Sequence, residues 1–376
     1  MEQYDQGSKD APVVVDCQNG ARDAGGVSRR RFVTSLAAFG ASVMLPSGGS
    51  VAQTVPRGTG NQPNRIDVHH HFLPTTYLRS QRERVLAAID SALIPVVLEW
   101  TPARAIEEMD RNGVATSIVS ITQPGIWFGD AQEARSLART CNEYGAQMAR
   151  DHPGRFGLFA AVPLPDPEGS LREIEYALDV LKADGVGLLT SYGDKWPGDP
   201  AYAPVFEELN RRKAVVFFHP AAPACCRNLI PDIAPPVLEL LFDTTRAITS
   251  LLWSGSLARF PDIRFIFTHA GGAMPVLASR VEGYVRRHKE LSQRVPHGVP
   301  YELKKLYYDV ANSVNPSSMA ALMNLVPTSQ ILFGSDYPFV EMGGMAQGLD
   351  NFGLSAADRQ AINRDNATRL LPRLKG

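Results

Sequence analysis

Eight short apolar runs alternate with amphipathic helical patterns from Arg65 onward, and no other feature of the sequence restricts the possible folds as strongly. Such alternation is typical of a parallel sheet with helical connections, and eight strands fit a closed barrel better than a doubly wound sheet. No Gly-x-Gly-x-x-Gly motif follows a strand, which disfavours a nucleotide-binding sheet. The sequence therefore predicts one distorted (β/α)8 barrel over residues 65–376, with an insertion at Tyr77–Trp100 whose form is not predicted. The predicted strands are Arg65–His69, Ala115–Ile121, Arg155–Leu164, Gly185–Ser191, Ala214–His219, Arg264–His269, Leu306–Val310 and Ile331–Gly334.

Composition places the chain among globular proteins and disfavours several classes of partner. Of its 376 residues, 44% are hydrophobic and 20% are charged, which is enough for a large core. The net charge of −1 gives no electrostatic reason to expect nucleic acid or an anionic membrane as a partner. Cysteines are too few and unevenly placed for a disulfide framework. For the adjacent pair Cys225-Cys226, an ordinary loop position is favoured over a redox or metal role.

The first 52 residues have the pattern of an export signal. Arginines at positions 29–31 precede an uncharged stretch from Phe32 to Leu45, and Ser50-Val51-Ala52 forms a small-x-small cleavage pattern. The uncharged stretch is too short for a membrane span, so a signal is favoured, with a disordered basic N-terminus as the alternative. The paired arginines resemble the twin-arginine signal, whose pathway carries folded proteins. We expect residues 1–52 to direct the protein to the periplasm and residues 53–64 to form a linker.

Metal-binding side chains stand at the ends of four predicted strands. The first strand ends in His69-x-His71, whose imidazoles share one face because successive side chains of a strand alternate. The fifth strand runs into His219, the sixth runs into His269, and Asp336 follows the eighth. In a barrel these ends converge on one face, where substrates bind. We therefore expect five potential metal ligands at one mouth.

Three histidines and one carboxylate are typical of a site for one borderline-soft divalent cation. Zinc is the most frequent occupant, with another divalent transition metal as the alternative. The fourth strand ends Gly187-Leu188-Leu189-Thr190-Ser191 without a lysine, which disfavours a two-metal site bridged by a modified lysine. Bound zinc would polarise a substrate oxygen and lower the pKa of its water.

Five segments carry a family resemblance. They are Ile66-Asp67-x-His69-x-His71, Glu108-Met109-Asp110-x-x-Gly113-Val114, Phe218-His219-Pro220, Thr268-His269-Ala270-Gly271-Gly272 and Gly334-Ser335-Asp336-Tyr337-Pro338-Phe339. With them, residues 65–371 resemble the amidohydrolase superfamily, in the branch of α-amino-β-carboxymuconate-ε-semialdehyde decarboxylase. The resemblance implies that zinc is held by His69, His71, His219 and Asp336. It also implies that His269 is the acid/base group, and that Asp336 doubles as a proton carrier.

The resemblance also assigns a substrate-binding residue. Arg280 lies eleven residues after His269, where the family places an arginine that binds the substrate carboxylate across a homodimer interface. A planar, permanently charged guanidinium suits that role, and an ordinary surface arginine is the alternative. Arg246 is a weaker candidate, for which a structural role is favoured. Asp309, at the end of the seventh strand, is either a structural carboxylate or a group that orients His269.

These observations predict an exported, metal-dependent enzyme that removes carbon dioxide from a small unsaturated or aromatic carboxylic acid without oxidation. The family's own decarboxylase carries a second substrate arginine before a Trp-x-Pro segment, whereas residues 93–99, before Trp100-Thr101-Pro102, contain none. The substrate is therefore expected to differ. The alternative activity is hydrolysis of a lactone, ester or amide at the same site. A catalytically inactive metal-binding or scaffold protein is a third interpretation, which the intact ligand set disfavours.

Overall fold

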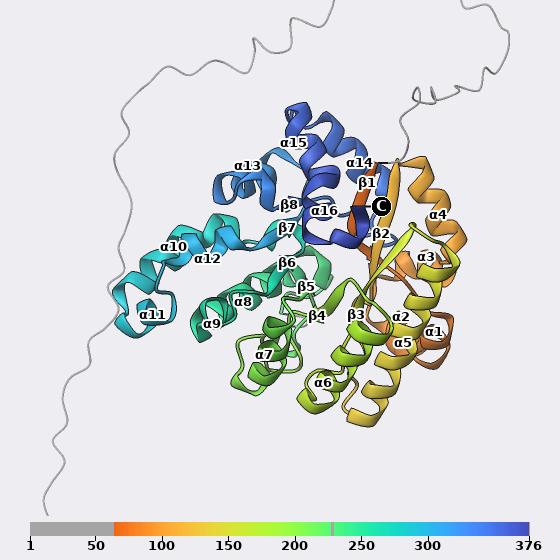
Figure 1. The fold of residues 1–376 in the computed structure, drawn as a ribbon, viewed down its shortest axis with the longest axis horizontal. Helices are drawn as coiled ribbons and strands as arrows, with labels where there is room; N and C mark the ends of the chain where they lie inside the picture. Colours follow the sequence, from red (N-terminus) through yellow and green to blue (C-terminus); the bar gives the residue numbers. More distant parts are fainter. Residues whose placement is uncertain (1–63, 227–228, 376) are drawn as a thin grey trace, which may run out of the picture. The chain divides into compact units, whose positions relative to one another are not determined.

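The computed structural model describes residues 64–226 and 229–375. The predicted export signal, residues 1–52, and all but the last residue of the predicted linker lie outside the described residues. The described residues form one sheet of eight parallel strands, paired in chain order from β1 to β8 and surrounded by helices (Figure 1). The strands are β1 (Arg65–His71), β2 (Val114–Ser120), β3 (Phe156–Ala161), β4 (Gly185–Leu189), β5 (Val215–His219), β6 (Arg264–Phe267), β7 (Tyr307–Asp309) and β8 (Ile331–Leu332).

The main helices follow the strands in turn, and several begin at a side chain that caps the helix. Thr101, Asp130, Asp166 and Asn315 each accept a hydrogen bond from the backbone N–H three residues later. None of the helices in the described ranges is long and apolar enough to cross a membrane. The helices that follow the strands are α4 (Pro102–Arg111), α5 (Ala131–Asp151), α6 (Pro167–Glu175), α7 (Ala203–Arg211), α8 (Glu239–Ser254), α9 (Ser256–Arg259), α10 (Met274–Arg287), α11 (Lys289–Arg294), α12 (Val299–Lys305), α13 (Pro316–Leu325), α14 (Met342–Asn351), α15 (Ala356–Gln360) and α16 (Asn366–Leu370).

The insertion after β1 is helical. It contains α1 (Thr75–Ser80), α2 (Arg82–Ala87) and α3 (Ile94–Leu98), which precede α4. Tyr77 is buried and donates a hydrogen bond from its hydroxyl to the carbonyl of Gly125, 2.6 Å away, in the loop after β2. This contact ties the insertion to the carboxyl-terminal side of the barrel.

The sheet closes because β1 bonds to the segment that directly follows β8. Val68 N–H donates to the Phe333 carbonyl at 3.0 Å, and Asp336 N–H donates to the His69 carbonyl at 2.8 Å. His71 N–H donates to the Tyr337 carbonyl at 2.8 Å. The predicted (β/α)8 barrel is therefore confirmed, with a short eighth strand. Closure places the first and last strands of the chain side by side.

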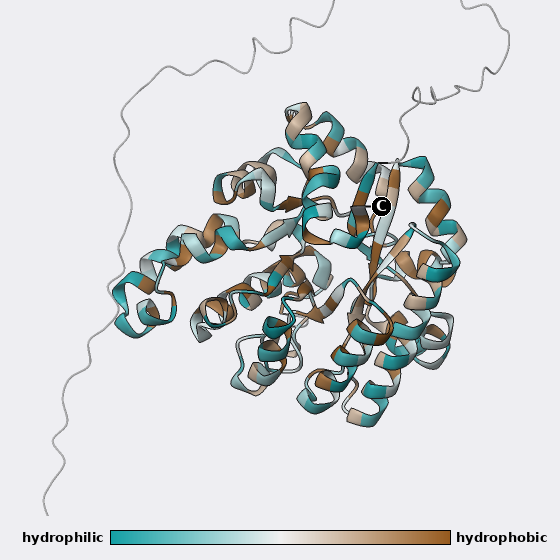
Figure 2. Ribbon diagram, viewed as in Figure 1, coloured by the Kyte–Doolittle hydropathy of each residue, from teal (hydrophilic) through white to brown (hydrophobic). Residues whose placement is uncertain are grey.

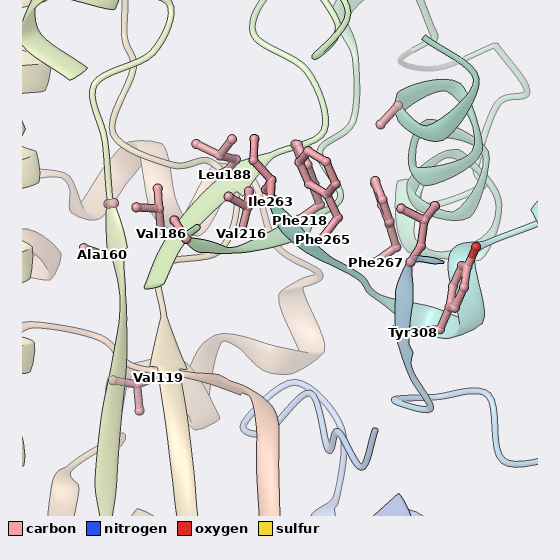
Figure 3. Packing of buried hydrophobic residues seen from close by; sticks show 14 of the residues in the cluster. Val119, Ala160, Val186, Leu188, Val216, Phe218, Ile263, Phe265, Phe267 and Tyr308 are labelled. Carbon is pink, nitrogen blue, oxygen red and sulfur yellow. The ribbon is translucent and has the colours of Figure 1, made fainter. Parts of the chain in front are cut away.

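Apolar side chains fill two compartments, one on each face of the sheet. Val215, Phe217 and Ile266 belong to the cluster inside the barrel, whose members also include Leu370 and Leu371 near the end of the chain. The alternate residues of the same strands pack against the surrounding helices, as Figure 3 shows for β5 and β6. Figure 2 shows the hydrophobic residues concentrated on the strands, with hydrophilic residues on the outer helices. This alternation follows from the two-residue period of a strand.

Candidate metal centre

All five predicted side chains meet at the carboxyl ends of the strands. His69 and His71 end β1, His219 ends β5, His269 lies in the turn after β6, and Asp336 follows β8. All five are at most 8% exposed. Ligand atoms of His69, His219, His269 and Asp336 lie within 4.8 Å of one another, which is a separation that one metal ion can span. The convergence expected from barrel closure is therefore present.

A local irregularity in β1 aims its two histidines into the barrel. Ile66 and Val68 belong to the inner core, so strict alternation would send His69 and His71 outward. The β1–β2 register shifts between Asp67 and His70. A shift of this kind re-aims side chains, as a β-bulge does. The shift explains how His69 and His71, which alternate with Ile66 and Val68 along the strand, also reach the interior.

Three of the ligand atoms form a tight triangle. His69 Nε2 and His71 Nε2 are 3.1 Å apart, and Asp336 Oδ1 lies 3.2 Å from the first and 3.0 Å from the second. Two ligands about 2.0–2.2 Å from one ion, at tetrahedral or octahedral angles, are separated by roughly 2.8–3.6 Å. His219 Nε2 and His269 Nε2 are farther out, at 4.0 Å and 3.9 Å from the Asp336 carboxylate. The triangle has the spacing of a coordination sphere.

All four imidazoles point Nε2 toward this centre because their Nδ1 atoms have acceptors elsewhere. His69 Nδ1–H donates to the Asp309 carboxylate at 3.0 Å, and His71 Nδ1–H donates to the Ser120 carbonyl at 3.2 Å. His219 Nδ1–H donates to the carbonyl of the next residue, Pro220, at 2.9 Å. His269 Nδ1–H donates to the Ala311 carbonyl at 3.0 Å. Metal-binding histidines usually have such a second partner, which fixes the tautomer and the ring orientation.

The charge balance at the centre also suits a cation. Burial disfavours the charged form of His69, but the carboxylates of Asp309 and Asp336 outweigh it and raise its pKa to about 10. Burial and neighbouring imidazoles lower the pKa of His71 and hold that of His219 well below its usual range. These two rings are therefore neutral near pH 7, the form that binds metals. The field that favours a proton on His69 equally favours a metal ion there.

Two carboxylates outside the triangle organise the strand ends, and the sequence analysis left the role of Asp309 open and gave none to Asp67. Asp309 orients the ring of His69; it reaches His269 only through the backbone N–H, at 3.1 Å. Of the two alternatives for Asp309, orientation of the His269 ring is not seen, because the Ala311 carbonyl takes that position. Asp67 is fully buried and joins β1 to the loop after β8. The sequence feature that could have indicated this role is the position of Asp67 in the Ile66-Asp67-x-His69 motif.

We expect Asp67→Ala to lower the free energy of unfolding by about 3 kcal/mol, because buried donors that lose their acceptor cost about 1–3 kcal/mol each. Asp67 Oδ1 accepts from Ser335 N–H at 2.9 Å and from His69 N–H at 3.1 Å, and Oδ2 accepts from Ser335 Oγ at 2.6 Å. Urea denaturation measures the loss. Asp67→Asn keeps one oxygen acceptor and should lose less; equal stabilities of the two variants would contradict the bonding role.

A cavity of about 150 Å³ adjoins the centre. Its size is that of a cavity that holds one benzene ring. His219, His269 and Asp336 line it together with apolar side chains, among them Ile89 and Leu240. Among the described residues, no arginine or lysine lines the cavity. The metal centre therefore opens onto a small and largely apolar chamber.

Most polar side chains of the cavity wall already have partners. Thr122 Oγ1 lies 3.2 Å from His219 Nδ1 and can only accept from it, beside the shorter bond to the Pro220 carbonyl, and Asp90 Oδ1 accepts from Ala92 N–H at 2.9 Å. The Gln123 amide donates to the Ala88 carbonyl and accepts from Ala222 N–H. Within the described part of the chain, the Asn312 amide has no hydrogen-bond partner. Asn312 is thus the amide available to a bound molecule.

The two arginines lie elsewhere. Arg280 is exposed on α10, and it does not line the cavity of its own chain. Arg246 on α8 lies 3.5 Å from Glu239 and 3.7 Å from Asp243, which fits the structural interpretation. Of the predicted residues, the structure therefore gathers the four histidines and Asp336, and leaves Arg280 apart.

Comparison with known proteins identifies the family. The family model described as amidohydrolase matches residues 66–373. Decarboxylase macB of Penicillium terrestre is 34% identical over 83% of this chain and 96% of its own length. The 6-methylsalicylic acid decarboxylase of Penicillium expansum is 34% identical over 83% of this chain and 97% of its own. A dihydroxybenzoic acid decarboxylase of Polaromonas sp. JS666, solved with manganese and the inhibitor 2-nitroresorcinol, shares the fold, with a TM-score of 0.74, 22% identity and coverage of 84% of this chain and 98% of its own.

The family match and the barrel agree with the expectation from the sequence motifs. The family model matches nearly the whole of the described barrel, and the two fungal relatives are matched over almost their full length. The resemblance predicted from five short segments is therefore confirmed: the chain belongs to the amidohydrolase family.

Proposed function

We propose that this protein is a metal-dependent enzyme that decarboxylates a small aromatic carboxylic acid without oxidation. The observation that carries the proposal is the convergence of four anchored imidazoles and Asp336 at a chamber of about 150 Å³. The chamber matches one aromatic ring. Similarity to decarboxylases along the full barrel supports the same reaction class.

We further propose that one divalent ion is held by His69, His71, His219 and Asp336. The triangle distances and the Nδ1 acceptors fit such an ion, and the ligand set suits zinc or manganese. A manganese-containing relative of the same fold makes manganese the principal alternative to zinc. When bound, such an ion polarises a substrate oxygen and stabilises negative charge on it.

His269 is the proposed acid/base residue. Its Nδ1 is held by the Ala311 carbonyl, so Nε2 is the atom that gives or takes a proton in the cavity. Decarboxylation requires a proton on the ring carbon that carries the carboxylate. The bond to the carboxylate then breaks, its electron pair returns to the ring, and carbon dioxide leaves. Asp336, whose Oδ2 lies 3.9 Å from His269 Nε2, is the proposed second proton carrier.

The chamber wall favours a ring with an alkyl substituent over a ring with a second hydroxyl group. The Gln123 amide and Asp90 Oδ1 are already engaged by backbone groups, and apolar side chains supply much of the remaining wall. A buried hydroxyl without a partner costs about 1–3 kcal/mol, which corresponds to roughly 5- to 150-fold in kcat/KM. We expect 6-methylsalicylic acid to be preferred over 2,6-dihydroxybenzoic acid by a factor in that range.

Carbon dioxide release from these two acids, measured with metal-loaded protein, tests both the reaction and the preference. The same assay includes aromatic esters and lactones, and chromatography detects ring-opened or hydrolysed products. Carbon dioxide in proportion to the decarboxylated product supports the proposal. Hydrolysis of an ester or lactone, without carbon dioxide from any acid, would contradict it in favour of a hydrolase.

We also propose that the protein is an exported homodimer in which Arg280 reaches the cavity of the second copy. In support, Arg280 is exposed one helical turn after Val276, which is 71% exposed. Other exposed apolar side chains lie on nearby α8 and the loop before it, including Phe242 and Val237. Exposed apolar side chains on and near the helix of an exposed arginine suit a protein interface. Light scattering distinguishes a dimer from a monomer, and fractionation of the native host tests periplasmic export.

A further inference from the structure

Two adjacent thiols lie together at the rim of the barrel. Cys225 and Cys226 belong to the short turn η5 (Ala224–Cys226), and their Sγ atoms are 2.8 Å apart. Cys225 is exposed and Cys226 is partly exposed, whereas Cys141 on α5 is buried. A disulfide reagent can therefore reach the pair directly.

The pair lies between the metal centre and the cavity wall. It follows β5, which ends at His219, and stands at the end of the first described range, residues 64–226. Before the pair, Ala222 N–H donates to the Gln123 side chain at 3.1 Å. After it, Pro236 and Leu240 line the cavity. Cys226 also lines a smaller apolar hollow with Leu238, the residue next but one before Leu240. A change at the thiols can therefore act on residues next to the cavity wall through this hollow, which Cys226 shares with Pro235 and Glu239.

We propose that Cys225 and Cys226 form a reversible dithiol–disulfide site that changes the affinity of the cavity for its substrate. The oxidant is a small-molecule disulfide. One thiolate attacks it, forms a mixed disulfide and releases one thiol. The neighbouring thiolate then attacks the mixed disulfide and releases the second thiol. The protein loses two protons and two electrons, and the disulfide reagent is reduced to two thiols.

Adjacent cysteines make an easily reversed bridge. Their Cα atoms are about 3.8 Å apart, which is closer than the roughly 4.4–6.8 Å of ordinary disulfides. A strained and exposed bridge is readily reduced, as in labile or regulatory disulfides. Because the bridge requires a different local geometry from the η5 turn, we expect its formation to shift the segment that carries Pro236 and Leu240.

Peptide mass mapping after treatment with glutathione disulfide tests the chemistry in the full-length, metal-loaded protein. Free thiols are trapped with N-ethylmaleimide before digestion. The tryptic peptide that contains both cysteines should lose two hydrogens, keep no glutathione and recover with dithiothreitol. Cys226→Ser should instead retain glutathione on Cys225, because no neighbouring thiol can displace it. The Cys141 peptide should stay reduced in both proteins, since that thiol is buried and its burial raises the pKa.

Retention of glutathione by the parent protein to the same extent as by Cys226→Ser would overturn the exchange step. The second readout is KM for the aromatic acid, which rests on the proposed function, whereas the mass readout does not. We expect KM of the parent protein to rise several-fold on oxidation with little change in kcat, and KM of Cys226→Ser to be much less affected. Equal KM values for the oxidised and reduced parent would overturn the coupling to the cavity.

Discussion

His71→Ala should bind its metal at least about 100-fold more weakly than the parent protein and should lose its turnover with it. His71 Nε2 completes the triangle, 3.1 Å from His69 Nε2 and 3.0 Å from Asp336 Oδ1. Its loss leaves two of the three closely spaced ligands and a gap beside a buried carboxylate. Metal content after dialysis against graded concentrations of a chelator, measured by mass spectrometry, gives the change in affinity.

His70→Asn is the matched control. His70 is the middle histidine of the run, yet its ring lies against Tyr337 and Phe156, and only its Nδ1 contacts a carboxylate, that of Asp67, at 3.2 Å. An asparagine amide can keep that bond, so this variant should retain its metal. If His71→Ala retains metal as well as the control does, the ligands are instead His69, His219, His269 and Asp336, whose atoms also lie close enough for one ion.

His269→Asn should keep the metal and lose about 10²- to 10⁴-fold in kcat, which is the usual contribution of a general acid or base. The asparagine amide can donate to the Ala311 carbonyl as His269 Nδ1 does, at 3.0 Å in the parent, but it has no atom in place of Nε2. The variant therefore removes the proton-transfer atom and preserves the local hydrogen bond. Carbon dioxide release and metal analysis on the same samples separate the two effects.

Loss of metal together with activity in His269→Asn would contradict the assignment and make His269 a ligand. A fall in kcat/KM that is due only to a higher KM would also contradict it, because it would give His269 a binding role. The two histidine variants thus distinguish the two possible ligand sets. The set that contains His71 predicts metal loss in His71→Ala, and the set that contains His269 predicts it in His269→Asn.

The barrel and the contents of its mouth could be predicted because the signals are local and repeated. Each apolar run, such as Val215–His219, predicts a strand from its own residues alone. Barrel closure then brings the ends of the strands together. His219 and Asp336 could therefore be placed at one site although 117 residues separate them (336 − 219). The same argument does not predict how the imidazole rings of the site are oriented.

Ring orientation depends on acceptors that the sequence does not mark. The Ser120 and Ala311 carbonyls, which hold His71 and His269, are backbone groups that any residue type could supply. The shift in register at Asp67–His70 has no residue signature either, and Asp309 could not be assigned to His69 rather than His269 from spacing alone. The insertion was not predicted because its helices are short, and tertiary contacts such as Tyr77 with Gly125 stabilise them.

Closure of the sheet between β1 and the segment after β8 has a consequence for biosynthesis. His69 and Asp336 adjoin in space but are made 267 residues apart (336 − 69), so nearly the whole barrel must leave the ribosome before these two proposed ligands can hold one ion. A truncated or stalled polypeptide would hold only an incomplete set of ligands. Metal binding at this site would therefore follow closure of the barrel and come at the end of folding.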